Sequence, residues 1–120
     1  MTVNKRARGE LGERIASAFL AVKGYEILRN NLRFARREID ILARRGDVLV
    51  AVEVKLRVGT QFGTAAEAVD QRKLGRIRIV LQQALRDVAR PATRPRIDVV
   101  AIDIAEDLGS MVVNHIEGVY

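Results

Sequence analysis

The sequence predicts a single α/β domain, residues 1–120, in which a mixed sheet is packed against helices in the order αβββαββ. Two observations predict this class. Apolar residues recur at helical spacing in two separate segments, whereas the intervening and following segments are short runs rich in Ile, Val and Leu. A chain of 120 residues is long enough to bury a core without cross-links. Cysteine is absent and histidine occurs once, which excludes thiol nucleophiles and Cys-based metal sites.

The first helix is expected from about Gly9 to Lys23. Its apolar residues recur at steps of four, four and three: Leu11, Ile15, Phe19 and Val22. Gly24 can adopt the left-handed conformation that commonly ends a helix. The spacing then changes to that of strands, which we expect at 25–34, 38–44 and 48–56. Gly46 marks a tight reversal between the last two, so the three strands form a meander.

A second helix is expected to begin near Asp70, after the capping-box spacing of Thr64 and Glu67, and to end near Pro91. The apolar run 97–104 is typical of a buried strand, and its connection to the third strand through a helix predicts a parallel crossover. A last strand is expected at 111–116. The apolar stripe from Leu74 to Val88 has two interpretations, a core-facing helix surface or the seam of a homodimer.

The charge of the chain is divided unevenly. Residues 1–96 hold all 21 basic residues against 10 acidic ones, a net charge of +11, while residues 97–120 carry a net charge of −5. This asymmetry indicates a polyanionic partner, and the low aromatic content favours phosphate contacts over base stacking. No apolar run approaches the length of a membrane span and no apolar leader segment begins the chain, so we expect a cytoplasmic protein that does not bind membranes.

The third strand carries two charged residues where a buried strand should have none. Val48, Val50, Val52 and Val54 fill one face, while Leu49 and Ala51 begin the other face and Glu53 and Lys55 complete it. Charged residues are seldom buried without partners. Taken alone, this segment allows either a mutually satisfied Glu53–Lys55 pair at the rim of the sheet or a functional site.

The hairpin before this strand brings a further carboxylate to the same face. A two-residue turn at 45–46 pairs residues whose numbers sum to 91, which places Asp40 opposite Ala51 and diagonal to Glu53, and sets Glu38 against Glu53. Two carboxylates on one face can share a divalent cation. Without a cation we expect one of them to have a raised pKa or to pair with Lys55. A three-residue turn would instead put Asp40 on the opposite side.

These residues form part of a longer series of motifs. It comprises Gly9-x-x-Gly12-Glu13, Gly24-Tyr25, Glu38-Ile39-Asp40, Glu53-Val54-Lys55-x-Arg57, Phe62-Gly63, Lys73 and Arg96-x-Asp98-Val99-Val100. The series resembles the YraN family of small bacterial proteins, which is similar to archaeal Holliday-junction resolvases and belongs to the restriction-endonuclease-like, PD-(D/E)XK superfamily. The chain departs from the family at Arg37, where Gly is usual, and has Ile39 where the superfamily has Pro.

The resemblance implies a restriction-endonuclease-like fold and assigns roles to individual residues. Asp40, Glu53 and Glu13 would hold Mg²⁺, with Mn²⁺ as a substitute, and Lys55 would be the catalytic lysine beside Asp40 and Glu53. These roles suit the chemistry, because Mg²⁺ prefers hard oxygen ligands and a lysine can orient water or offset developing negative charge.

Three basic residues are expected to contact nucleic acid: Arg57, Lys73 and Arg37. The plainer interpretations are an ordinary loop for Arg57 and a solvated first helical turn for Lys73. For His115, which has no second imidazole nearby in the sequence, we expect a structural role, and for Asp98 an ion pair with Arg96 at the rim of the sheet.

The sequence therefore predicts a Mg²⁺-dependent nuclease that hydrolyses DNA phosphodiesters, with branched or structured DNA as its substrate and a homodimer as one form of the protein. The alternative is a non-catalytic nucleic-acid-binding or assembly protein that retains the nuclease fold. RNA processing is a third interpretation, since no residue pattern reads the 2′-hydroxyl.

Overall fold

The computed structural model describes residues 4–59, 61, 63–87 and 93–120. Within them the chain forms α1 (Lys5–Val22), β1 (Glu26–Phe34), β2 (Arg37–Arg45), β3 (Val48–Val58), a short 3₁₀ helix η1 (Ala66–Ala68), α2 (Gln71–Asp87), β4 (Arg94–Ile104) and β5 (Met111–Ile116). The sheet has the order β1-β2-β3-β4-β5, with β3 and β4 parallel and the other pairs antiparallel. The predicted α/β class and element order are confirmed.

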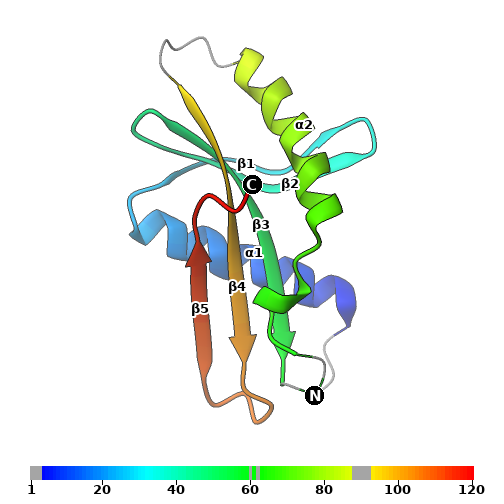
Figure 1. Cartoon of the computed structure of the whole chain (residues 1–120). Helices are drawn as coiled ribbons and strands as arrows, with labels where there is room; N and C mark the ends of the chain where they lie inside the picture. The colour runs from blue at the N-terminus through cyan, green and yellow to red at the C-terminus, as the bar shows by residue number, and fades with distance from the viewer. Residues whose placement is uncertain (1–3, 60, 62, 88–92) are drawn as a thin grey trace.

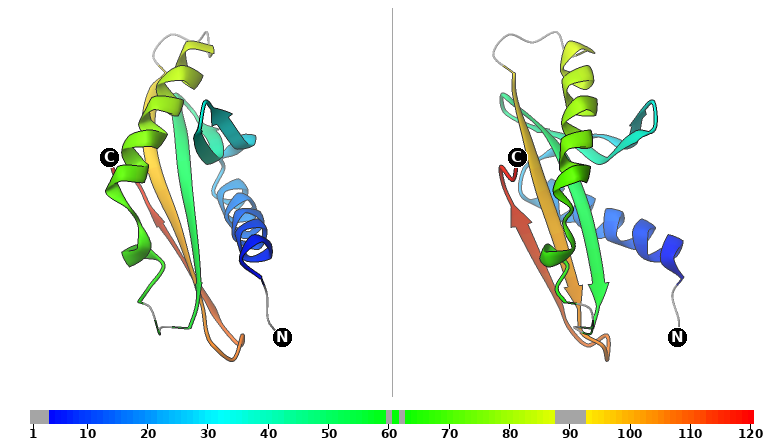
Figure 2. Two further views of the ribbon diagram at one scale, coloured as in Figure 1. Left: turned by 90° about the vertical axis from the view of Figure 1, so that its right-hand side faces the viewer. Right: turned by 45° about the vertical axis from the view of Figure 1, so that its right-hand side comes forward.

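The sheet lies between the two helices, with α1 against one face and α2 against the other (Figures 1 and 2). Each face therefore has its own apolar core. Ala16 and Leu20 of α1 pack on Val50 and Val52 of β3, whereas a separate cluster joins α2 to the opposite face of the same strand. β3 is central, so both of its faces are buried, as its sequence predicts.

Helix α1 begins four residues earlier than expected. Asn4 caps it, because the Asn4 side-chain oxygen accepts a 2.8 Å hydrogen bond from the amide of Ala7. Gly9, which we expected at the start, lies inside the helix, and a methyl group added there would meet no atom within 4 Å. The predicted end is correct, since Gly24 adopts a φ of 94° just after the last turn.

The β2–β3 hairpin differs from the expected register by two residues. Its turn is Gly46-Asp47 rather than Arg45-Gly46, so Arg45 pairs with Val48 and Ile41 with Val52. Paired numbers sum to 93 instead of 91. The shift is even, so the paired residues stay on their predicted faces as far as Ile41, but Ile39 packs in the α2-face core and Ile41 in the α1-face core, so alternation breaks around Asp40. Extended by one residue, the register places Asp40 opposite Glu53, and Glu38 is not set against Glu53.

Asp70 caps helix α2, as its sequence predicts, whereas the predicted capping residue Thr64 lies in front of η1 and not of α2. Thr64 Oγ1 accepts from the amide of Glu67 at 3.3 Å, and Asp70 Oδ1 accepts from the amide of Arg72 at 2.8 Å. Its apolar stripe packs into the core, with Leu74, Ile77, Leu81 and Ala84 buried against the sheet. The stripe is therefore the core-facing surface of the helix and cannot serve as a dimer interface. A homodimer stays a prediction, but it would need another surface. Val88 and Pro91 lie outside the described residues.

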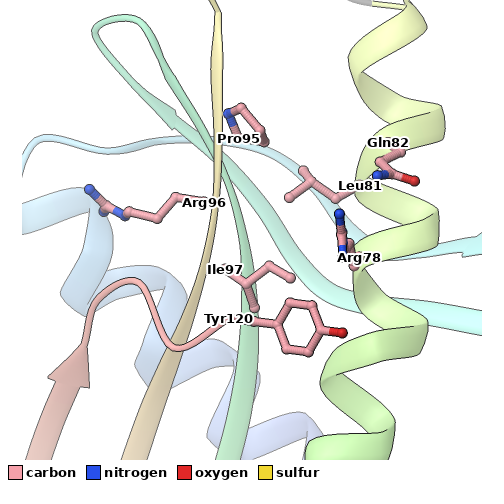
Figure 3. A pocket seen from close by; sticks show the side chains of 7 residues that line it. All are labelled: Arg78, Leu81, Gln82, Pro95, Arg96, Ile97 and Tyr120. Carbon is pink, nitrogen blue, oxygen red and sulfur yellow. The ribbon is translucent and has the colours of Figure 1, made fainter.

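The C-terminal segment folds back over the α2 face of β4. The amide of Val119 donates to the carbonyl of Ile97 at 2.8 Å, and the guanidinium of Arg78 lies 5.7 Å from the centre of the Tyr120 ring. Arg78, Ile97 and Tyr120 border a cavity of about 390 Å³. Arg96 also lines it, and Figure 3 shows the Arg96 side chain extending from β4 to the side opposite Ile97 and Tyr120. In the part of the chain described here, no helix is both long and apolar enough to cross a membrane.

Candidate metal centre

Three carboxylates from two elements converge at the end of the sheet where β2 leaves β3. Oxygens of Glu13 in α1 and of Glu38 and Asp40 in β2 all lie within 4.8 Å of one another. We call these three residues the carboxylate cluster. Such a spacing is close to what one octahedral divalent cation needs, since its ligand oxygens lie about 2.0–2.1 Å from Mg²⁺.

Asp40 occupies the point at which the β2–β3 ladder ends. The last paired residues are Ile41 and Val52, and beyond them β2 pairs only with β1. Asp40 Oδ2 accepts a 2.9 Å hydrogen bond from the amide of Val54, so its carboxylate takes the place of a missing backbone partner. This contact fixes Asp40 beside Glu53.

Glu53 is the most deeply buried member of the site, with 2% of its side chain exposed. Burial and then the proximity of Asp40 raise the pKa of Glu53 from its ordinary 4.5 to about 8, in spite of a lysine nearby. Its Oε2 is buried and has no hydrogen-bond partner among the described residues. A buried carboxylate oxygen without a donor is unusual in folded proteins and indicates that a cation or proton belongs there.

The lysine that contacts Glu53 is Lys73, in the first turn of α2. Lys73 Nζ lies 3.0 Å from Glu53 Oε1, and this pairing raises the lysine's pKa although burial acts to lower it. Lys55, which we expected beside Glu53, is half-buried and makes no hydrogen bond or ion pair with any described residue. A carboxylate of raised pKa is thus present as expected, but its ion pair comes from the helix and not from β3.

Glu13 reaches the cluster because α1 packs closely on β3. A methyl group added at Gly12 would lie 3.4 Å from Leu56 Cβ and from Val54 Cγ1, so the helix backbone here packs closely against β3. Burial, then repulsion from Asp40 and Glu38, raises the pKa of Glu13. The first helix thus places the Glu13 carboxylate beside other carboxylates, and not in water as on an ordinary exposed helix surface.

Two residues that the sequence did not single out support the cluster. In the amide orientation that satisfies both acceptors, the Asn31 nitrogen donates to Glu13 Oε1 at 2.7 Å and to Glu38 Oε1 at 2.8 Å. Arg33 Nε lies 3.0 Å from Glu38 Oε2. Asn31 has a φ of 53°, a conformation that Asn tolerates better than most residues. This preference is the only local feature of the sequence that could have pointed to Asn31.

The residues expected to contact nucleic acid come from three different elements, β2, β3 and α2. Arg37 is half-buried at the start of β2, and Arg57 is exposed near the end of β3. The positive φ in the β1–β2 turn belongs to Ala35, at 57°, so Arg37 is accommodated where the family usually has Gly. Phe62 lies outside the described residues.

A second group of titratable residues lies on the α1 face of β4 and β5. Asp98 is fully buried and accepts four hydrogen bonds: from Arg96 Nε at 2.8 Å, Arg96 Nη2 at 2.9 Å, His115 Nε2 at 2.7 Å and the amide of Gly118 at 3.0 Å. The Arg96–Asp98 pair is present as expected, but it is buried and not at the rim. The geometry also brings Glu117 within ligand distance of Asp98 and His115. Because donors already saturate Asp98, this group is a structural network.

The raised pKa of Glu53 predicts how the unfolding free energy depends on pH when divalent cations have been removed. Its folded-state pKa is raised, so its contribution is full below about pH 4.5 and is lost as pH rises towards about 8. We expect the unfolding free energy to fall across this window in EDTA, and Glu53→Gln to flatten the fall. Urea unfolding from pH 5 to 8.5 measures both, and identical slopes for the two proteins would contradict the assignment.

Fold and site together define an α/β protein whose mixed sheet carries clustered carboxylates where the β2–β3 ladder ends. Carboxylates are the ligands that hard divalent cations prefer, and a lysine lies beside them. Residues 12–102 match the family described as "Uncharacterised protein family UPF0102", and the chain belongs to this family, the YraN family indicated by its motifs.

Relatives match over most of the chain. UPF0102 proteins of Rhodococcus opacus, Moorella thermoacetica and Kineococcus radiotolerans are 46%, 42% and 42% identical to it. These matches cover 82%, 85% and 96% of this chain and 83%, 85% and 94% of the relatives. Their names state no activity, so the function has to be argued from the site.

Proposed function

We propose that this protein is a Mg²⁺-dependent nuclease that hydrolyses DNA phosphodiesters in the cytoplasm, with branched or otherwise structured DNA among its substrates. The observation that carries the proposal is the convergence of Glu13, Glu38 and Asp40 beside the buried, partly unpartnered carboxylate of Glu53. Each of these carboxylates has a donor, yet burial and then the proximity of Asp40 raise the pKa of both Glu13 and Glu53, and Glu53 Oε2 has no partner among the described residues, which a purely structural arrangement would not require.

The donor set fits magnesium. All candidate ligands are carboxylate oxygens, and the Asn31 side chain helps to hold two of them in place. Asp40, Glu53 and Glu13 are the proposed ligands, and Glu38 completes the acidic rim. Mn²⁺, which accepts the same ligands, should substitute.

The residues of the chain divide the work of phosphodiester hydrolysis. When bound, Mg²⁺ would acidify a water molecule and offset negative charge on the phosphorane. Lys73 balances the charge of Glu53, and Lys55, on the same strand face, orients the attacking water or stabilises the developing charge. Arg37 and Arg57 contact the phosphates that flank the scissile bond.

A panel of labelled DNA forms with Mg²⁺ or Mn²⁺ tests the proposal. The panel should include duplex, single-stranded, flapped and four-way-junction DNA, each with wild type and with Glu53→Ala. We expect cleavage of at least one structured form by wild type alone. Equal cleavage in both preparations would point to a contaminant, and DNA binding without cleavage would favour the non-catalytic alternative.

The uneven charge of the chain predicts a strong salt dependence of DNA binding. Residues 1–96 carry a net charge of +11, and each phosphate they neutralise should lower the slope of log K against log salt by about 0.9. For about three to five contacts, affinity should fall roughly 50- to 500-fold between 50 and 200 mM salt. Fluorescence anisotropy in EDTA measures this without cleavage. An affinity that hardly changes would remove the polyanion interpretation.

A further inference from the structure

The tip of the β1–β2 hairpin and the first half of α2 border a second cavity, in which every charged lining residue is an arginine. Its volume is about 440 Å³, and it is lined by Ala35, Arg36 and Arg37 of the hairpin and by Arg76 of α2. We call it the arginine cavity. Figure 2 shows the hairpin tip projecting from the sheet beside α2, so two separate elements form the walls.

The arginines of this cavity are not neutralised. Among the described residues, Arg36, Arg37 and Arg76 make no ion pair and no side-chain hydrogen bond. Some other arginines do have a carboxylate partner, as Arg33 has Glu38, Arg94 has Asp47 and Arg96 has Asp98, while several exposed ones in the described part of the chain have none. What sets Arg36, Arg37 and Arg76 apart is that they lie at one cavity. Three guanidinium groups with free donors at one cavity repel each other, and a bound anion would relieve that repulsion.

The cavity and the metal centre draw on the same two elements, β2 and α2. Arg37 directly precedes Glu38 of the carboxylate cluster in β2, and Arg76 follows Lys73 by three residues, which is about one turn of α2. A polymer whose phosphate lies at the carboxylate cluster can therefore reach the arginine cavity with a neighbouring phosphate.

The lining selects the class of ligand. Guanidinium groups match phosphate oxygens with paired hydrogen bonds, and the cavity has no aromatic side chain to stack a base and no carboxylate to bind a sugar or a cation. We propose that the arginine cavity binds a backbone phosphate of the nucleic-acid strand next to the phosphate at the metal centre. The inference rests on the proposed function, since it assigns the path of the same substrate strand.

Binding measurements without cleavage test the inference. In EDTA, with a labelled DNA duplex of about 30 base pairs, Arg76→Ala and Arg36→Ala should each lower affinity about 3- to 10-fold and make the salt slope shallower by about 0.9. Arg76→Lys should retain part of the affinity. Arg86→Ala is the matched control, because Arg86 is an exposed arginine in the last turn of the same helix and its replacement removes the same charge.

The outcomes separate this inference from the nuclease proposal. Equal losses for Arg76→Ala and Arg86→Ala would mean diffuse charge and would overturn the assignment. Inorganic phosphate that saturates the cavity without displacing DNA, at constant ionic strength, would assign it to a small phosphate ligand instead. Asp40→Asn retains the arginine cavity and should still bind DNA, so loss of cleavage alone leaves the inference standing.

Discussion

Asp40→Asn is expected to abolish Mg²⁺ binding and DNA cleavage while leaving the protein folded. The amide oxygen of Asn can still accept the hydrogen bond from Val54, so the strand geometry is retained. Changes to groups that merely support metal ligands cost about 10- to 100-fold, so loss of a proposed ligand should lower metal affinity and cleavage by at least about 100-fold. Titration calorimetry with Mg²⁺ or Mn²⁺ measures the affinity directly.

The same substitution should raise the stability of the metal-free protein. Asp40 raises the pKa of both Glu53 and Glu13, so its charge opposes theirs, and removing it relieves this repulsion. We expect a gain on the order of 1 kcal/mol in unfolding free energy at neutral pH, well below the bare Coulomb energy because Glu53 is already largely protonated. Glu26→Gln, which removes an exposed carboxylate at the start of β1, is the control. Unchanged Mg²⁺ affinity in Asp40→Asn would rule out the metal centre.

Asp98→Asn is expected to destabilise the fold more than any change at the metal centre. The substitution removes the charge that faces Arg96 and turns an amide NH₂ towards donors, in a position with no access to water. Breaking a buried ion pair from one side costs about 3–5 kcal/mol. Since 26% of the Arg96 side chain is exposed and can turn to water, we expect about 3 kcal/mol, or a melting temperature lower by about 10 °C.

Asp47→Asn supplies a matched control for this prediction. Asp47 also binds an arginine through two hydrogen bonds, to Arg94 Nε at 3.0 Å and Arg94 Nη2 at 3.1 Å, but both side chains are mostly exposed. Water replaces the lost contact, so no measurable change is expected. Equal losses in the two variants would show that burial of Asp98 contributes nothing. The DNA affinity of Asp98→Asn, measured below its melting temperature, should match wild type.

The strand pattern predicted the fold well because alternation survives errors of register. Val50 and Val52 face α1 while Leu49 and Ala51 face α2, as period-two alternation requires. The two-residue shift at the hairpin could not be predicted, because the position of Asp47 depends on β4: its carbonyl accepts from the amide of Arg94 at 2.7 Å, and its carboxylate binds the same residue's guanidinium. Sequence rules for two-residue turns consider only neighbouring residues, so they cannot predict a contact with β4.

The composition of the candidate site was predictable in part. Strand parity predicted that Asp40 and Glu53 lie near each other, and Asp40 does lie close enough to add to the effect of burial in raising the pKa of Glu53, whereas Glu13 entered through the family motif. The contact between Lys73 and Glu53 was not predictable, since it depends on how the crossover from β3 lays α2 over the sheet. Asn31 was missed because its role depends on the bulged pairing of β1 and β2, which no sequence pattern marks.

The distribution of the site along the chain has a consequence during synthesis. Glu38 and Asp40 are neighbours within β2, but Glu13, Glu53 and Lys73 approach them only when α1, β3 and α2 have packed on one another. A ribosome-bound or partly unfolded chain therefore holds an incomplete set of carboxylates, with little affinity for Mg²⁺. Under the proposed function, cleavage would become available only once folding is nearly complete, and Mg²⁺ bound to the assembled site would favour the folded state by mass action.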